Sequence, residues 1–280
     1  MILLRLAFLP AALLGALYIA LSPRFAIRFY HPFLFHPDKY PNGNWEVEEI
    51  NGIKKEEVFF RSANGKKLHA WHFSAPGADK TIIFNHGNAG NLTTRLATIE
   101  ALLQTNASVF VYDYQGYGLS EGAPSLSSIC DDGRAAYDYL VLERLRPADK
   151  ILLYGESLGA GVACEISTTR RCAGIILQSG FSSLERIGKE VLPAVRLYPS
   201  ALYPSPRLDN LSILKRPHPP LLLLHGDNDP VVPINHSRQI FEEALEPKSF
   251  TILEGSNHGD TAVLNSEKFR QSLISFLSRV

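Results

Sequence analysis

The sequence has few cysteines, no excess of charge of either sign and no repeated or low-complexity segment. Its three cysteines are an odd number, which excludes a fully paired disulfide framework and favours free, mostly buried thiols. Lys and Arg together number 28, as do Asp and Glu, and no basic patch stands out, so nucleic acid is not an expected partner. The chain has neither an H-E-x-x-H motif nor a Cys/His cluster, and no metal or other cofactor is expected.

The N-terminus differs from the rest of the chain. Residues 1–22 are almost continuously apolar, and their only charged side chain is Arg5. This length approaches the ~20 residues that span a hydrocarbon core. A cleaved signal peptide is the alternative, but no good small-x-small cleavage site follows. We therefore expect a membrane protein anchored by an N-terminal helix. Its orientation is open, because Arg5 is balanced by Arg24 and Arg28 on the other side.

Residues 55–280 show the pattern of one α/β domain, preceded by a linker over residues 23–54 that is rich in Pro, Phe, Tyr and His. A hairpin is expected around Asn64-Gly65, between strands at 57–62 and 67–73. Short apolar segments then alternate with helical stretches, at 81–85, 108–112, 150–154, 174–178, 221–224 and 249–253. This alternation predicts a mostly parallel sheet with helices on both faces. The last helix should start at a cap on Asp260 or Thr261.

The most informative motif is Gly155-Glu156-Ser157-Leu158-Gly159, directly after the apolar run 151–154. A buried strand that enters a G-x-S-x-G turn and then a helix has the layout of a nucleophile elbow. The two glycines relieve the collision that side chains would make in so sharp a turn. Ser157 is therefore the candidate nucleophile, held at a helix N-terminus whose dipole favours developing negative charge.

A serine nucleophile needs a base, and the base needs an acid to orient it. In this architecture the chain order is serine, acid, histidine. Asp227 and Asp229 both follow the strand at 221–224, and the Gly-x-x-Asp-x-x-Val-Pro spacing favours Asp229. A plain turn would explain these acids equally well, but it would not predict a histidine after the next strand. His258 occurs there, where the general base is expected.

The oxyanion hole requires two backbone N–H groups, for which Leu158 and Asn88 are the candidates. Leu158 follows the nucleophile, and Asn88 lies in His86-Gly87-Asn88-Ala89 after the strand at 81–85. A plain turn and a phosphate-binding loop are the alternatives for that loop, but it lacks the Walker Lys-Ser/Thr. The loop at 113–122 is interpreted as structural, with direct substrate contact as the alternative. Residues 181–219 form a short cap, which either admits an acyl chain or simply packs on the domain.

Together these residues resemble an α/β-hydrolase of the serine-hydrolase kind. The segments His-Gly-Asn-Ala and Asp-Tyr-x-Gly-Tyr-Gly-x-Ser-x-Gly are similar to those of membrane-anchored α/β-hydrolase-domain proteins, over roughly residues 50 to 280. The resemblance implies that the serine is acylated and that water releases the acid. It also implies acyl esters or thioesters as substrates, including lipids and acylated proteins.

The sequence thus predicts a serine hydrolase that cleaves acyl esters or thioesters with the triad Ser157, Asp229 and His258. A peptidase or aminopeptidase of the same fold is one alternative, and a catalytically inert membrane scaffold is another. A small-molecule or lipid acyl ester is the expected partner, together with the membrane. The sequence leaves the acyl length, the leaving group and the oligomeric state open.

Overall fold

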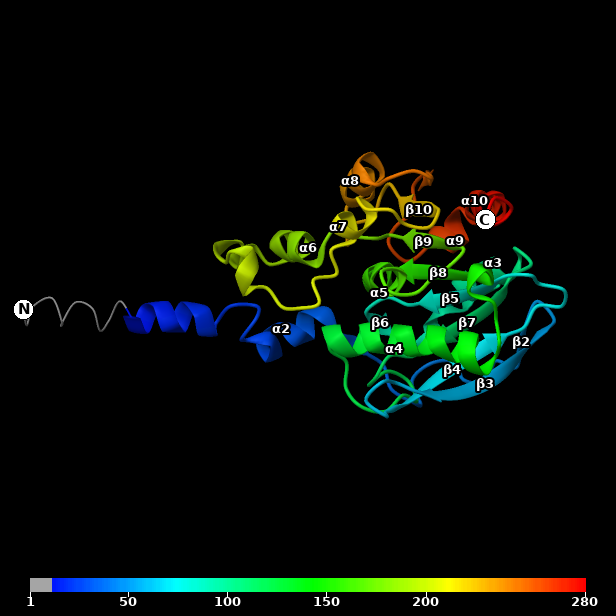
Figure 1. The fold of residues 1–280 in the computed structure, drawn as a ribbon, viewed down its shortest axis with the longest axis horizontal. Helices are drawn as coiled ribbons and strands as arrows, with labels where there is room; N and C mark the ends of the chain where they lie inside the picture. The colour runs from blue at the N-terminus through cyan, green and yellow to red at the C-terminus, as the bar shows by residue number, and fades with distance from the viewer. Residues whose placement is uncertain (1–11) are drawn as a thin grey trace, which may run out of the picture.

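The computed structural model describes residues 12–280, in which one large twisted sheet forms the centre of the molecule (Figure 1). Its strand order is β11-β10-β9-β8-β5-β7-β4-β3-β2. The six strands from β11 to β7 are parallel, and the remaining three pair antiparallel. The strand bounds are β2 Glu49–Ile50, β3 Ile53–Arg61, β4 Lys67–Phe73, β5 Thr81–Asn85, β7 Ser108–Tyr112, β8 Ile151–Glu156, β9 Gly174–Gln178, β10 Leu221–Gly226 and β11 Lys248–Leu253.

The central strands lie where the sequence predicts them, because they are buried on both faces and read as continuous apolar runs. β5, β7 and β9 have the predicted bounds, and the β3–β4 hairpin turns at Asn64-Gly65. The segment expected as a linker contributes more structure than predicted. It holds helix α2 (Ile27–Leu34), β2 at the sheet edge, and strand β1 (His36–Pro37), which pairs with β6 (Ala89–Gly90).

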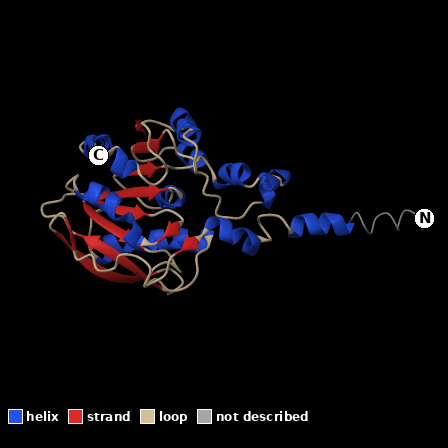
Figure 2. Ribbon diagram, turned by 180° about the vertical axis from the view of Figure 1, so that it is seen from behind, coloured by secondary structure: helices blue, strands red, loops and turns tan. Residues whose placement is uncertain are grey.

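Helices cover both faces of the sheet (Figure 2). On one face α5 (Leu158–Ser167) packs between α4 (Leu126–Asp138) and α7 (Asn210–Leu214), and α7 contacts α8 (Asn235–Glu243). On the other face α3 (Leu96–Leu103) contacts α9 (Thr261–Leu264) and α10 (Ser266–Leu277). The predicted α/β architecture is therefore confirmed.

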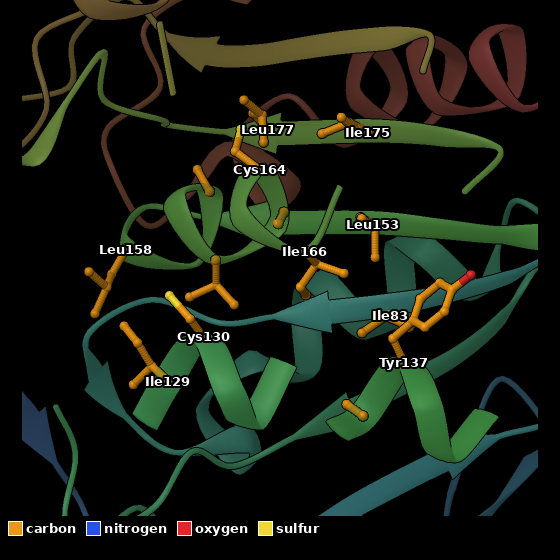
Figure 3. Packing of buried hydrophobic residues seen from close by; sticks show 14 of the residues in the cluster. Ile83, Ile129, Cys130, Tyr137, Leu153, Leu158, Cys164, Ile166, Ile175 and Leu177 are labelled. Carbon is orange, nitrogen blue, oxygen red and sulfur yellow. The ribbon is translucent and has the colours of Figure 1, made fainter. Parts of the chain in front are cut away.

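Each face has its own apolar core. Ile83, Leu153 and Ile175 point to the α4–α5 side, whereas their strand neighbours Ile82 and Leu152 point to the α3–α10 side. Figure 3 shows the first cluster, in which Ile129 and Cys130 of α4 and Cys164 and Ile166 of α5 gather at the α4–α5 contact. All three cysteines are free, and burial raises the pKa of Cys130 to about 12.

The structure differs from the expectation at the C-terminal helix and describes only part of the expected N-terminal anchor. A helix does begin at Thr261 after Asp260, but it is the short α9, and the last helix, α10, begins after an interruption at Asn265. Asp260 accepts the backbone N–H of Asn257. At the other end, residues 1–11 of the expected anchor lie outside the described residues. Within residues 12–280, no helix is both long enough and apolar enough to cross a membrane.

Between β9 and β10, residues 181–219 form the short cap. It comprises α6 (Leu184–Val191), two 3-10 turns, η4 (Pro193–Leu197) and η5 (Ser200–Leu202), and α7. The cap lies beside α2 at the end of the molecule from which the N-terminal helical residues 12–20 project (Figures 1 and 2).

Candidate active site

Ser157 stands at a sharp strand-to-helix turn between β8 and α5. Its backbone has φ 53° and ψ −115°, a region that L residues rarely adopt. The flanking glycines make this turn possible. A Cβ on Gly155 would approach the Gly159 carbonyl oxygen to 2.3 Å, and a Cβ on Gly159 would approach the Asn85 carbonyl oxygen to 1.9 Å. The elbow geometry therefore requires glycine at both positions.

His258 and Asp229 form a hydrogen-bonded pair, with 2.7 Å between His258 Nδ1 and Asp229 Oδ2. Asp229 Oδ1 accepts the backbone N–H groups of Val231 and Val232, each at 2.9 Å. Burial raises the pKa of Asp229, but hydrogen bonds from His225 and His258 outweigh it and hold the pKa well below its usual range. The carboxylate is therefore ionised and fixes a proton on His258 Nδ1, which leaves Nε2 free to act as a base.

The other candidate acid, Asp227, has a different role. Its Oδ1 accepts the backbone N–H of Gly255 at 2.6 Å, so it joins the loop after β10 to the loop after β11. In the structure, therefore, Asp229 pairs with His258, and Asp227 stabilises the contact between the two loops. Among residues 12–280, Ser157 Oγ makes no hydrogen bond with the His258 ring, so the structure directly joins only His258 and Asp229 of the three predicted triad residues.

His225 supports the loop that carries Asp229, a role that the sequence did not predict. A histidine at the end of a buried strand is more often a packed core residue. Its ring is fully buried, with Nε2 2.8 Å from the Val232 carbonyl oxygen and 3.3 Å from Asp229 Oδ2. Nδ1 lies 2.7 Å from Ser237 Oγ of α8. His225 therefore connects the loop that carries Asp229 to helix α8.

The candidate oxyanion donors are free to bind a ligand. In the described part of the chain, neither Asn88 N–H nor Leu158 N–H has an acceptor. Leu158 is the first residue of α5, where backbone N–H groups have no partner within the helix. Both residues line the same cavity as Ser157.

The loop carrying Asn88 is held by side chains from the 113–122 segment. Tyr117 Oη donates to the Asn88 carbonyl oxygen at 2.7 Å, and Tyr114 Oη donates to that of His86 at 2.9 Å. The Gly87 carbonyl and the Asn88 N–H belong to one peptide group, and a second contact fixes this group. His86 Nδ1 lies 2.7 Å from the Gly87 carbonyl oxygen. The C=O and N–H of one peptide point in opposite directions, so this contact directs Asn88 N–H away from His86. The structural interpretation of the 113–122 loop is consistent with these contacts.

A cavity of about 330 Å³ opens at Ser157. The described residues that line it include no Asp, Glu, Lys or Arg. Its walls come from the N-terminal segment, the cap and the loop after β10, and comprise Pro23, Ile27, Tyr30, Phe33, Leu34, Phe181, Leu184, Ile187, Gly188, Val191, Leu192, Val195, Tyr203, Pro204, Val231 and Val232, with His36, Asn88 and Leu158 beside the serine. Such a cavity suits an apolar group of substrate. Within residues 12–280, no group of three or more His, Cys, Asp or Glu side chains is arranged to hold a metal ion.

The strand order, the elbow after β8 and the His258–Asp229 pair define an α/β-hydrolase fold. A family model described as "Serine aminopeptidase, S33" matches residues 76–218. The chain belongs to this family of hydrolases. An uncharacterized protein of Mycobacterium tuberculosis is 30% identical over 224 residues, which are 79% of each chain. An uncharacterized membrane protein of Saccharomyces cerevisiae is 29% identical over 223 residues and covers 78% of each chain.

Solved structures share the fold at lower identity. An esterase from Pyrococcus furiosus superposes with a TM-score of 0.73 at 21% identity, over 88% of this chain and 98% of the esterase. A puromycin-hydrolyzing peptidase from Mycobacterium tuberculosis has a TM-score of 0.62 at 19% identity, over 81% of this chain and 39% of the peptidase. Both comparisons confirm the fold, and both esterase and peptidase activities occur on it.

Proposed function

We propose that the protein is a serine hydrolase that cleaves acyl esters or thioesters through an acyl-enzyme intermediate. The observation that carries the proposal is the apolar cavity at Ser157, bounded by two unpaired backbone N–H groups at Asn88 and Leu158. An acyl chain in this cavity would present its carbonyl carbon to the serine and its oxygen to the two donors.

In the proposed mechanism, Ser157 Oγ attacks the acyl carbonyl and passes its proton to His258 Nε2. The N–H groups of Asn88 and Leu158 stabilise the tetrahedral oxyanion, and the loss of one such donor typically costs about 10²- to 10³-fold in rate. His258 then protonates the alcohol or thiol leaving group. In the second half-reaction His258 takes a proton from water, the water attacks the acyl-enzyme, and the proton returns to Ser157 Oγ as the acid is released. Asp229 stabilises the imidazolium that forms in each half-reaction.

An aminopeptidase is the second candidate, favoured by the family description that matches residues 76–218. Such an enzyme must bind the free ammonium group of its substrate. The described residues that line the cavity offer no carboxylate for that purpose. An apolar acyl group therefore fits the cavity better than an amino-terminal residue.

The membrane anchor over residues 1–22 stays part of the proposal. The described part of it, residues 12–20, is helical and exposes large apolar side chains, with Leu14 67% exposed. Extraction of the full chain from membranes at alkaline pH would test the anchor, because an anchored chain stays in the pellet and an unanchored chain is released.

A fluorophosphonate probe tests the catalytic proposal. Wild-type protein should be labelled and Ser157→Ala should not. Ser179→Ala is the matched control, since Ser179 also follows a buried strand and also has a positive φ of 50°. It should label as wild type does. Labelling that persists in Ser157→Ala, or absence of labelling in folded wild type, would contradict the proposal. Faster turnover of aminoacyl amides than of aryl esters would favour the aminopeptidase.

A further inference from the structure

Helix α2 has a broad apolar face, yet none of its residues is buried. Its inner face lines the cavity through Ile27, Tyr30 and Leu34. Phe33 lies at the rim of the cavity and is 49% exposed, and Phe29, which does not line the cavity, is 68% exposed on the outer side. Arg28 and His31 make α2 amphipathic, but its apolar face is wider than the part that lines the cavity, and an apolar helix face normally packs against a partner. The exposed apolar side chains of α2 therefore indicate a surface that is covered by a binding partner.

The apolar surface continues onto the neighbouring segments. Tyr18 stacks on Tyr198 of the cap with ring centroids 4.8 Å apart, and Arg24 N–H donates to the Leu202 carbonyl oxygen at 2.9 Å. These contacts hold the N-terminal helical residues against the cap. The N-terminal helical residues 12–20, α2 and the cap lie together at one end of the molecule (Figures 1 and 2). Their exposed apolar side chains include Leu17, Leu21, Phe25, Phe29, Phe33 and Leu197. We call this set the apolar end.

The charge around the apolar end has one predominant sign, although the whole chain is neutral. Residues 12–35 and 184–207 contain two carboxylates, Glu185 and Glu190, and six cations, which are Arg24, Arg28, Arg186, Lys189, Arg196 and Arg207. Glu185 is paired with Lys189 and Arg207. Among the described residues, Arg24, Arg28 and Arg196 have no carboxylate partner. Exposed apolar side chains bordered by unpaired cations are complementary to a bilayer with anionic headgroups.

The mouth of the cavity lies within this surface. Phe33 and Val191 line the cavity and are also about half exposed or more, at 49% and 60%. One comes from α2 and the other from α6, so the two helices stand on either side of the opening. A group that leaves the bilayer here would pass between apolar walls to Ser157.

We propose that the apolar end docks on an anionic bilayer, and that the acyl chain of the substrate passes directly from the bilayer between α2 and α6 to Ser157. This inference rests on the proposed hydrolase function for its substrate, but the docking itself does not depend on catalysis. The occupant of the apolar end is therefore a lipid surface, and a second copy of the chain is the competing outcome.

Docking is tested on the full chain reconstituted into vesicles that contain phosphatidylserine and brominated acyl chains. Phe29→Trp places a fluorophore on the apolar end. Phe59→Trp is the matched control, because Phe59 is an exposed aromatic residue on β3, next to the edge strand β2 and outside the segments that form the apolar end. Bromine should quench the fluorescence of the tryptophan introduced by Phe29→Trp and should leave the fluorescence of the one introduced by Phe59→Trp unchanged. Equal quenching of both, or of neither, would overturn the docking proposal.

Substrate access is tested with the double variant Phe25→Ser/Phe29→Ser, since neither residue lines the cavity. Hydrolysis of a long-chain ester embedded in the vesicles should fall about tenfold or more, as expected for the loss of two apolar contacts with the bilayer. Hydrolysis of a short, water-soluble ester should not change. An equal fall for both esters would overturn the proposed route.

The remaining outcomes separate this inference from the proposed function. Bromine quenching of Phe29→Trp in a protein that no fluorophosphonate labels would uphold docking and reject the hydrolase. Labelling of Ser157 with Phe29→Trp unquenched would do the reverse. A dimeric mass that is lost in Phe25→Ser/Phe29→Ser, with no bromine quenching, would assign the apolar end to a second copy of the chain.

Discussion

Gly188 offers a direct test of the cavity as an acyl site. It lies on α6, lines the cavity, and a Cβ built on it meets no atom within 4 Å. Gly188→Leu should therefore place four carbons at the cavity wall, in space that an acyl chain would occupy. Each methylene of the acyl chain that can no longer be buried loses about 0.8 kcal/mol of binding free energy, so four lose about 3 kcal/mol. This corresponds to roughly a 200-fold loss of kcat/KM for long acyl esters.

The assay compares p-nitrophenyl esters of increasing chain length. Gly188→Leu should leave the acetyl ester unaffected and lower the turnover of long-chain esters. Gly188→Ala is the control and should change the chain-length profile little. Because glycine is a poor helix former, Gly188→Leu should also raise Tm by roughly 2 °C, which shows that the fold is intact. An equal loss for short and long esters, or no loss for either, would refute an acyl site at Gly188.

Two further predictions concern charged groups. Asp229→Asn should lower kcat by about 10⁴-fold through loss of tautomer control on His258, whereas Asp227→Asn should stay active, because it holds only a turn. Burial and nearby Arg144 lower the pKa of His72 from 6.5 to about 4. Between these values the unfolded chain binds the proton and the folded chain does not, so acidification from pH 6.5 to 4 should cost about 3 kcal/mol of stability. His72→Gln should flatten that dependence.

Their measurements are independent. Steady-state kinetics on folded protein would reject the Asp229 assignment if Asp227→Asn lost as much activity as Asp229→Asn. Urea unfolding of wild type and His72→Gln at several pH values tests the histidine. If the difference between the two proteins were constant from pH 7 to 4, His72 would not be the group that titrates.

The predictable part of the fold is the part built from local patterns. β5, β7 and β9 have the predicted bounds because parallel strands covered on both faces leave uninterrupted apolar runs. The elbow was predictable because a turn this sharp requires glycine two residues before and two after Ser157. The break between α9 and α10 falls at Asn265, where the polar run 265–268 interrupts the apolar pattern before Phe269.

By itself, the sequence determined the parallel α/β architecture, the position of Ser157 and the chain order of serine, acid and histidine. The spacing also favoured Asp229 over Asp227, and the structure pairs Asp229 with His258. Only the tertiary structure decided that His225 supports this pair and that Tyr117 holds the Asn88 loop. It also decided that α2 and the cap, about 150 residues apart in the chain, form one apolar cavity. The reason is physical: backbone patterns follow from neighbours in the chain, whereas hydrogen-bond partners and cavity walls follow from contacts that exist only when the chain is folded.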